Sequence, residues 1–393
     1  MVTTILKYVS ISAAVVVGLY AALLGLLSTS FCQRHVVYLH GIQMTWFKDL
    51  NVPELFGFLR NQVSPFSIQT SDGETLYAWH ILPVGLYRKH EEVLIAEPSG
   101  FVLDITSRLS FKLLRDDPEA RLVLHFHGAG GTVGSGYRTP NYRALSAGQP
   151  DNIHVLTFDY RGFGRSMGTP SEQGLLLDAL AVVKWATNVA GIPLSRIIVF
   201  GQSMGTAVTL AISEHFALQL QPIVFAGTVL VAPLVDSATL VSTYKIAGTV
   251  PLLSPLARFP TALAYMGTLI RDKWLSKDRI ASYIRANEAN VEQYRLTLIH
   301  AEDDWDIPFH HSQMLFWHAV NATVSGGISY QDLEGKKNKA KVDLGAAGSV
   351  MEWRTGVGVI REEILQTGLH DAIMGYPVIT LAVMRMFDSA AEL

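Results

Sequence analysis

The sequence is poor in cysteine and carries almost no excess of either charge. A single thiol, Cys32, cannot form a disulfide within the chain. The 31 lysines and arginines against 34 acidic residues give a formal net charge of −3. This balance excludes a strong basic field of the kind that binds nucleic acid, so no nucleic-acid partner is expected. The chain also lacks internal repeats and low-complexity tracts, which excludes the repeat architectures.

Charge is absent altogether from residues 8–27, YVSISAAVVVGLYAALLGLL. As a helix with a rise of about 1.5 Å per residue, this stretch spans roughly 30 Å, the thickness of a bilayer core. Its length favours a retained transmembrane signal anchor over a cleaved signal peptide, although Ser28-Thr29-Ser30 would serve as a cleavage site. A buried globular helix is the third alternative. We predict an anchor at 8–27.

The rest of the chain alternates between strands and helices. Residues 66–70 and 75–79 flank an Asp-Gly turn, which predicts a β-hairpin. Apolar runs predict further strands at 122–126, 154–158, 197–200, 228–232 and 296–300, and a helical spacing of leucines spans 171–189. Alternation of this kind indicates a mostly parallel sheet that is covered by helices on both faces.

Two stretches do not fit a simple alternation. Residues 233–294 separate two predicted strands by about twice the length that a crossover needs, and they are largely apolar. We predict a mostly helical cap there, with ordinary helix packing as the alternative. Residues 325–349 include the basic run 336–341, for which a solvated loop is expected and contact with anionic lipid head groups is the alternative.

The chemistry centres on residues 201–205, which match G-x-S-x-G. They follow the apolar strand at 197–200 and open a helical segment of small residues, the context of a nucleophile elbow. Ser203 is then the predicted nucleophile, held in a strained turn. Only glycine at positions 201 and 205 would let strand and helix pass so closely.

A serine hydroxyl needs a base that accepts its proton and an acid that orients the base. In this arrangement the chain order is serine, acid, histidine. Residues 300–308, HAEDDWDIP, follow the strand after the predicted cap and contain D-x-x-I-P. This motif selects Asp304 as the acid, with Asp303 as the second choice and Asp306 as the third.

The base is expected on the loop that follows the final strand and precedes the last helix. His370 has this position, because the helical segment 372–387 comes directly after it. His310 and His311 follow too closely behind the acid and are expected to begin the next helix.

The developing oxyanion needs two backbone N–H donors. We predict Met204, which follows the nucleophile, and Ala129, in the glycine-rich loop after the strand that ends at residue 126. Residues 37–41, VYLHG, imitate this loop but precede the hairpin, so we interpret them as a decoy. His125 and His127 alternate along a strand without a third ligand, so neither a metal nor a cofactor is predicted.

Several motifs resemble one known family. These are TFDYRGFGRS at 157–166 with GTPSE at 168–172, AWH at 78–80, HAEDD at 300–304 and IPF at 307–309. Over residues 60–315 the chain resembles the membrane-anchored α/β-hydrolase domain-containing protein twelve family, as a fungal-type relative. The resemblance implies an α/β-hydrolase fold with Ser203, Asp304 and His370 as triad. It also implies a serine lipase for monoacylglycerols and lysophospholipids, notably lysophosphatidylserine, whose catalytic domain faces the endoplasmic reticulum lumen.

The sequence therefore predicts an anchor at 8–27 and an α/β-hydrolase domain at 36–393 with a cap insertion at 233–294. The expected activity is cleavage of lipid carboxylic esters through an acyl-enzyme on Ser203. A thioesterase or amidase with the same triad and a non-catalytic interaction module are the alternatives. Two departures stand out. Gln202 and Met204 replace the histidine and leucine that are usual in animal members, and residues 325–368 follow the family pattern poorly.

Overall fold

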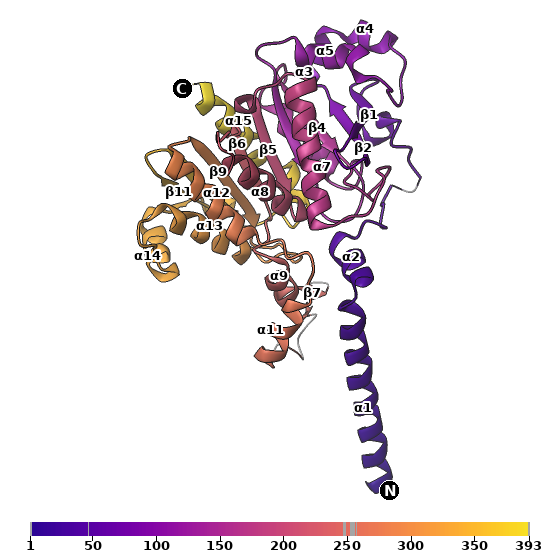
Figure 1. Cartoon of the computed structure of the whole chain (residues 1–393), viewed down its shortest axis with the longest axis vertical. Coiled ribbons are helices and arrows are strands. Elements are labelled where there is room, and N and C mark those ends of the chain that lie inside the picture. The colour runs from indigo at the N-terminus through magenta and orange to yellow at the C-terminus, as the bar shows by residue number, and fades with distance from the viewer. Residues whose placement is uncertain (1, 46, 247–248, 252–255, 257, 392–393) are drawn as a thin grey trace.

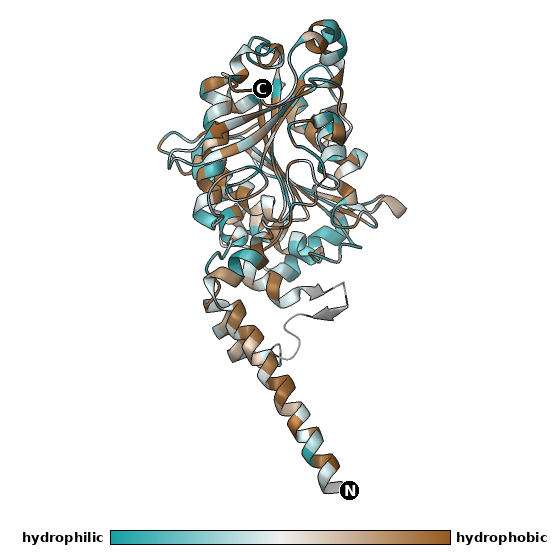
Figure 2. Cartoon of the chain, turned by 90° about the vertical axis from the view of Figure 1, so that its right-hand side faces the viewer, coloured by the Kyte–Doolittle hydropathy of each residue, from teal (hydrophilic) through white to brown (hydrophobic). Residues whose placement is uncertain are grey.

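The computed structural model describes residues 2–45, 47–246, 249–251, 256 and 258–391 (Figure 1). A long helix, α1 (Val2–Leu27), extends away from the folded domain and leads into α2 (Ser30–Tyr38). Residues Thr4–Leu27 of α1 are long and apolar enough to cross a membrane, and none of their most apolar stretch is buried. Figure 2 shows the same helix as mostly hydrophobic and extending well beyond the domain.

The domain is built on a 10-stranded sheet in the order β1-β2-β4-β3-β5-β6-β9-β12-β11-β10. Neighbouring strands from β4 to β12 are parallel, and the strands at both ends are antiparallel. The strands are β1 (Val63–Gln69), β2 (Thr75–Ile81), β3 (Arg121–Phe126), β4 (Ile153–Phe158), β5 (Ile197–Gln202), β6 (Gly227–Val231), β9 (Tyr294–Ala301), β10 (Val342–Asp343), β11 (Ser349–Arg354) and β12 (Gly358–Leu365). The predicted hairpin and the mostly parallel sheet are confirmed.

Alternating side chains of the central strands bind a helical layer to each face of the sheet. Leu122 and Leu124 of β3 share one core with α7 (Glu172–Lys184) and α8 (Met204–Ala217). Val123 belongs to the opposite core, with α6 (Arg138–Ala147) and α15 (Pro377–Ala391). Successive residues of a strand face opposite sides, so this run of apolar residues supports both layers. Figure 1 shows the sheet between the two layers.

Shorter elements complete the domain. They are the helices α3 (Val84–Lys89), α4 (Glu91–Ala96), α5 (Leu109–Arg115), α13 (His310–Thr323) and α14 (Tyr330–Ala340), with single 3₁₀ turns such as η6 (Ala372–Gly375). The expected helix at 372–387 is thus a 3₁₀ turn followed by α15, because Pro377 lacks an N–H and suits a first helical position. The helix expected at 171–189 ends at Lys184 and continues as a π turn, Trp185–Val189.

The stretch 233–294 contains two different kinds of structure. Its last helix, α12 (Ser276–Asn290), packs between α8 and α13 and buries Ile280, Tyr283 and Ile284. The preceding part comprises α9 (Ser237–Thr243), the strand pair β7 (Lys245–Ile246) and β8 (Val250–Pro251), and α11 (Pro260–Thr268). These elements project from the domain beside α1 (Figure 1). α11 buries none of its residues, unlike α12.

The basic run at 336–341 is not the solvated loop that the sequence suggested. Residues 336–340 belong to α14, and Lys337 is only 4% exposed. Its Nζ lies 2.6 Å from Oε2 of Glu362 on β12, which is also buried. The ion pair with Glu362, a residue distant in the sequence, therefore accompanies the burial of this one lysine. The composition of the run does not indicate such a pair.

Replacing Lys337 should destabilise the fold strongly. A Lys337→Met variant leaves Glu362 buried without its counterion, and removal of one partner of a buried pair costs about 3–5 kcal/mol. Lys339→Met is the matched control, because Lys339 is exposed on the same helix and its loss should change stability by less than about 0.5 kcal/mol. Denaturant unfolding of the detergent-solubilised chain measures both, and equal midpoints would contradict the predicted contribution of the pair.

Candidate active site

The G-x-S-x-G turn joins β5 to α8 in a strained geometry. Ser203 has φ 55° and ψ −125°, a conformation that L-residues rarely adopt. A Cβ at Gly205 would overlap the carbonyl oxygen of Phe126 on β3, and one at Gly201 would overlap the Thr209 hydroxyl. Both glycines are therefore required, as predicted, because strand and helix approach too closely for any side chain.

Two neighbouring parallel strands bring an acid and a histidine together. Asp304 follows β9, His370 follows β12, and the last pair in their register is Ala301 with Leu365. Nδ1 of His370 lies 2.7 Å from Oδ2 of Asp304, whose side chain is fully buried. A neutral imidazole donates its Nδ1–H to this carboxylate, which leaves Nε2 as an acceptor.

Four groups donate to the Asp304 carboxylate. Besides His370, the backbone N–H groups of Asp306 and Ile307 donate to its Oδ1, each at 2.9 Å. His300 Nε2 lies 3.1 Å from Oδ2 and 2.9 Å from the carbonyl oxygen of Ile307. Both of these atoms only accept, so Nε2 of His300 carries the proton.

This environment separates the pKa values of the acid and the histidine. Burial opposes ionisation of Asp304, but hydrogen bonds from His300 and His370 hold its pKa well below the usual range. Burial opposes protonation of His370, but the hydrogen bond and negative charge of Asp304 raise its pKa. The carboxylate stays ionised and stabilises an imidazolium beside it.

The other two candidate acids have different positions. Oδ1 of Asp303 accepts the N–H groups of Gly368 and Leu369, each at 2.8 Å. Leu369 has φ 49°, so these bonds hold the strained turn that precedes His370. Asp306 is exposed, and one of its carboxylate oxygens lies within 4.8 Å of a carboxylate oxygen of Asp304 and of a ring nitrogen of His370. The structure thus places Asp304, and neither alternative, in contact with His370.

The predicted oxyanion loop lies against Ser203. A Cβ at Gly128 would be 3.0 Å from Cβ of Ser203, so the backbone at this point passes directly beside the serine. Met204 is the first residue of α8, where an N–H has no acceptor within the helix. In the part of the chain that the structure describes, the N–H groups of Met204 and Ala129 donate to no protein acceptor. Both amides are available to a ligand.

Two features that the sequence did not identify hold this loop in place. The guanidinium of Arg138 donates to the carbonyl oxygens of Gly128, Gly130 and Thr132, at 3.1, 2.6 and 2.6 Å. Because the Gly128 carbonyl and the Ala129 N–H belong to one trans peptide and point in opposite directions, the bond to Gly128 directs the Ala129 N–H away from Arg138. Arg138 is nine residues beyond Ala129 on α6, and no local motif indicates such a contact.

The segment 37–41, interpreted as a decoy, is the second feature. The carbonyl oxygen of Tyr38 accepts the N–H of Gly130 at 2.8 Å, and that of Ile42 accepts the N–H of Gly131 at 2.6 Å. The segment and the residue that follows it therefore support the predicted oxyanion loop, each through one carbonyl group. Its place in the sequence, far before the loop, concealed this packing.

Gln202 links the elbow to the histidine loop. Its Nε2 donates to Oδ1 of Asp371 at 3.2 Å and to the carbonyl oxygen of His370 at 3.4 Å. His125 and His127 are buried with separate partners, the Thr157 hydroxyl and the Gly128 carbonyl oxygen. Burial lowers the pKa of both histidines, which suits neutral side chains in a core.

Comparison with known proteins agrees with this architecture. The chain is 29% identical over 288 residues to lysophosphatidylserine lipase ABHD12 of Xenopus tropicalis. The matched region covers 72% of this chain and 64% of the frog protein, so the chain spans less than two thirds of the length of that relative. It is 27% identical over 334 residues to protein ABHD12B of Homo sapiens, covering 82% and 81% of the two chains. The resemblance inferred from the sequence motifs is therefore confirmed.

The fold also matches a solved structure. The crystal structure of an alpha-beta hydrolase from Vibrio vulnificus superposes with a TM-score of 0.51 at 15% identity, covering 78% of this chain and 90% of that one. Residues 122–332, just over half of the chain, match the sequence model of a family described as "Alpha/beta hydrolase family". The chain belongs to the alpha/beta hydrolase family.

Proposed function

We propose that this chain is a membrane-bound serine hydrolase that cleaves carboxylic esters of monoacylglycerols or lysophospholipids. The observation that carries the proposal is the 2.7 Å contact between Asp304 and His370, at the same sheet edge as the strained Ser203. A base oriented by a buried carboxylate beside a nucleophile elbow is the arrangement that acyl transfer requires.

The proposed reaction proceeds in two halves. Nε2 of His370 takes the proton of the Ser203 hydroxyl as Oγ attacks the ester carbonyl, and the N–H groups of Met204 and Ala129 stabilise the oxyanion. The imidazolium then protonates the leaving alcohol, which yields an acyl-enzyme. Water, deprotonated by the same histidine, attacks the acyl group and releases a fatty acid and free Ser203.

The relatives and α1 support the proposed substrate class. The frog relative is a lysophosphatidylserine lipase, and Thr4–Leu27 could cross a membrane. We propose a transmembrane anchor at 8–27, an endoplasmic reticulum location with a luminal catalytic domain at 36–393, and a cap within 233–294. The projecting elements α9 to α11 supply the cap, since α12 belongs to the helical layer of the domain.

Loss of the nucleophile should abolish catalysis. Ser203→Ala removes the only atom that the mechanism acylates, so ester turnover should fall by about 10⁶-fold. Labelling by a fluorophosphonate probe should vanish in parallel. Ser329→Ala, at the exposed serine that caps the N-terminus of α14, should leave both readouts unchanged. Residual labelling of the Ser203→Ala chain at another serine, together with turnover, would reject the assignment.

The pH profile should report the raised pKa of His370. The base works only when it is neutral, and a raised pKa keeps it protonated to higher pH, so the acid limb of kcat/KM should have a midpoint above the ordinary value of about 6.5. Asp304→Asn removes the acceptor that raises this pKa, so the midpoint should move down while kcat falls by about 10⁴-fold.

Asp303→Asn is the matched control for that change. The asparagine keeps an Oδ1 that accepts from Gly368 and Leu369, so both the midpoint and kcat should stay close to the parent values. An equal loss in the two variants would show that the acid has been assigned to the wrong residue.

Removal of α1 should release the protein from membranes. A chain without residues 2–27 keeps Thr29, which caps α2 through its side chain, and loses the whole apolar helix. Carbonate extraction followed by sedimentation should find the parent in the pellet and the shortened chain in the supernatant. Retention of the shortened chain in the pellet would assign membrane attachment to another surface.

A further inference from the structure

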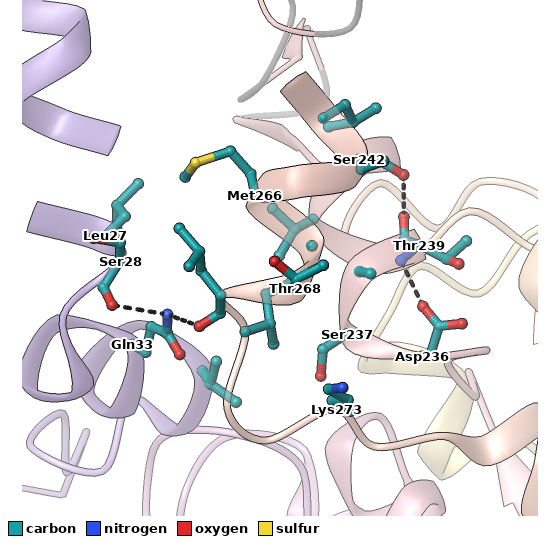
Figure 3. Close-up of a pocket in the computed structure, with 18 of the residues that line it drawn as sticks. Leu27, Ser28, Gln33, Asp236, Ser237, Thr239, Ser242, Met266, Thr268 and Lys273 are labelled. Atoms are coloured by element: carbon teal, nitrogen blue, oxygen red, sulfur yellow. Dashed lines mark hydrogen bonds between the residues drawn. The ribbon is translucent and has the colours of Figure 1, made fainter. Parts of the chain in front are cut away.

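A cavity among the described residues lies away from Ser203, between the end of α1, α2 and the projecting elements α9 and α11 (Figure 3). Its volume is about 610 Å³, within the range of pockets that hold small-molecule ligands. Neither Ser203 nor His370 lines it. The proposed catalytic mechanism leaves this space unexplained.

One side of the pocket is apolar and belongs in part to the membrane helix. Leu24 and Leu27, in the last turn of α1, form a wall together with Val36 of α2. Leu263 and Met266 of α11 form the facing wall. Because α1 is the candidate membrane span, its final turn marks the level at which the bilayer would end. This side of the pocket therefore lies at the lipid boundary.

The other side is polar. Asp236 pairs with Lys277 at 2.7 Å, and the Ser237 hydroxyl donates to the carbonyl oxygen of Asp272 at 2.8 Å. Figure 3 shows Leu27 and Asp236 on opposite sides of the space, with Lys273 near Ser237. A ligand that fits both sides has an apolar chain at one end and a polar group at the other.

The polar side leads toward the catalytic edge of the sheet. The carbonyl oxygen of Val231, the last residue of β6, accepts the N–H of Ser203 at 2.9 Å. Asp236 follows Val231 by five positions, so their Cα atoms are at most about 18 Å apart. The polar side of the pocket is thus formed by the chain segment that continues directly from the edge of the sheet that carries Ser203.

Specific hydrogen bonds hold the two walls together. The side chain of Gln33 on α2 donates to the carbonyl oxygen of Leu269 at 2.8 Å and accepts the N–H of Arg271 at 3.0 Å. The hydroxyl of Tyr38 donates to Oδ2 of Asp272 at 2.8 Å. These three bonds join α2 to the segment that follows α11. The pocket therefore lies between elements that these hydrogen bonds hold in fixed positions.

We infer that this pocket holds the acyl chain of a monoacyl lipid taken from the bilayer, with the polar head directed toward Ser237 and Lys273. The inference rests on the proposed function and extends it, because it makes the end of α1 part of the substrate site. A chain that leaves the bilayer here would exchange lipid contacts for those of α1 and α11 and stay out of water.

Gly267 offers a way to fill the pocket without disturbing the fold. It lies on α11 and lines the cavity, and a Cβ there would have only Ala238 Cβ, at 3.9 Å, within 4 Å. Phenylalanine at 267 would project into the space between α11 and α9. Gly335 on α14 is the matched control, because a Cβ there meets nothing within 4 Å and the residue is remote from the pocket lining.

The test uses the full chain carrying Ser203→Ala, reconstituted in phosphatidylcholine vesicles with a C18 monoacylglycerol that bears a diazirine on its acyl chain. Irradiation should label peptides from 24–37 and 260–270. Gly267→Phe should reduce labelling at least about tenfold, since losing the burial of two methylenes already has that effect. Gly335→Phe should leave it unchanged.

A second arm separates this inference from the proposed function. With Ser203 intact, Gly267→Phe should keep fluorophosphonate labelling and hydrolysis of p-nitrophenyl acetate, which shows that the variant is folded, while hydrolysis of the C18 ester falls. Equal photolabelling of the two glycine variants, or labelling confined to other peptides, would overturn the pocket assignment. Absence of fluorophosphonate labelling in the parent would overturn the proposed function instead.

Discussion

The close approach of the first turn of α8 to the end of β3 is the constraint on which the rest of the site depends. No side chain fits at Gly205, because the carbonyl oxygen of Phe126 occupies that space. This contact accompanies the positive-φ turn at Ser203 and the close approach of Ser203 to Gly128, where the predicted oxyanion loop begins. One steric condition therefore positions the proposed nucleophile and both proposed oxyanion donors together.

The proposed acid and base depend on a different principle, the shared edge of adjacent parallel strands. β9 and β12 end in register, so the turns that follow them meet without a long excursion of either chain. Hydrogen bonds then fix each turn: Asp303 holds the backbone before His370, and Gln202 reaches the backbone at His370 from the elbow. Pre-organisation of this kind lowers the reorganisation that catalysis would require.

Local signals in the sequence were enough for seven of the ten strands, the hairpin and the elbow, because each depends on periodicity or on glycine at a fixed spacing. The strands β10, β11 and β12 were not among those predicted. These signals were insufficient where a residue distant in the sequence determines the position of a side chain or a loop. Lys337 is buried by Glu362, Arg138 reaches back to the oxyanion loop, and Tyr38 supports that loop from far upstream. Such contacts cannot be predicted from the spacing of residues along the sequence, because nothing near either partner indicates the other.

The short helix α2 connects features that would otherwise be independent. Only Ser28 and Thr29 separate it from α1, so the direction of α1 limits the orientation of α2. Tyr38, at its end, contacts the oxyanion loop through its carbonyl oxygen and the segment after α11 through its hydroxyl. Burial of this side chain raises the pKa of its hydroxyl, which stays a neutral donor. A change in the angle between α1 and the domain would therefore strain both contacts, so the orientation of α1 and the arrangement of the loop at Gly130 depend on one another.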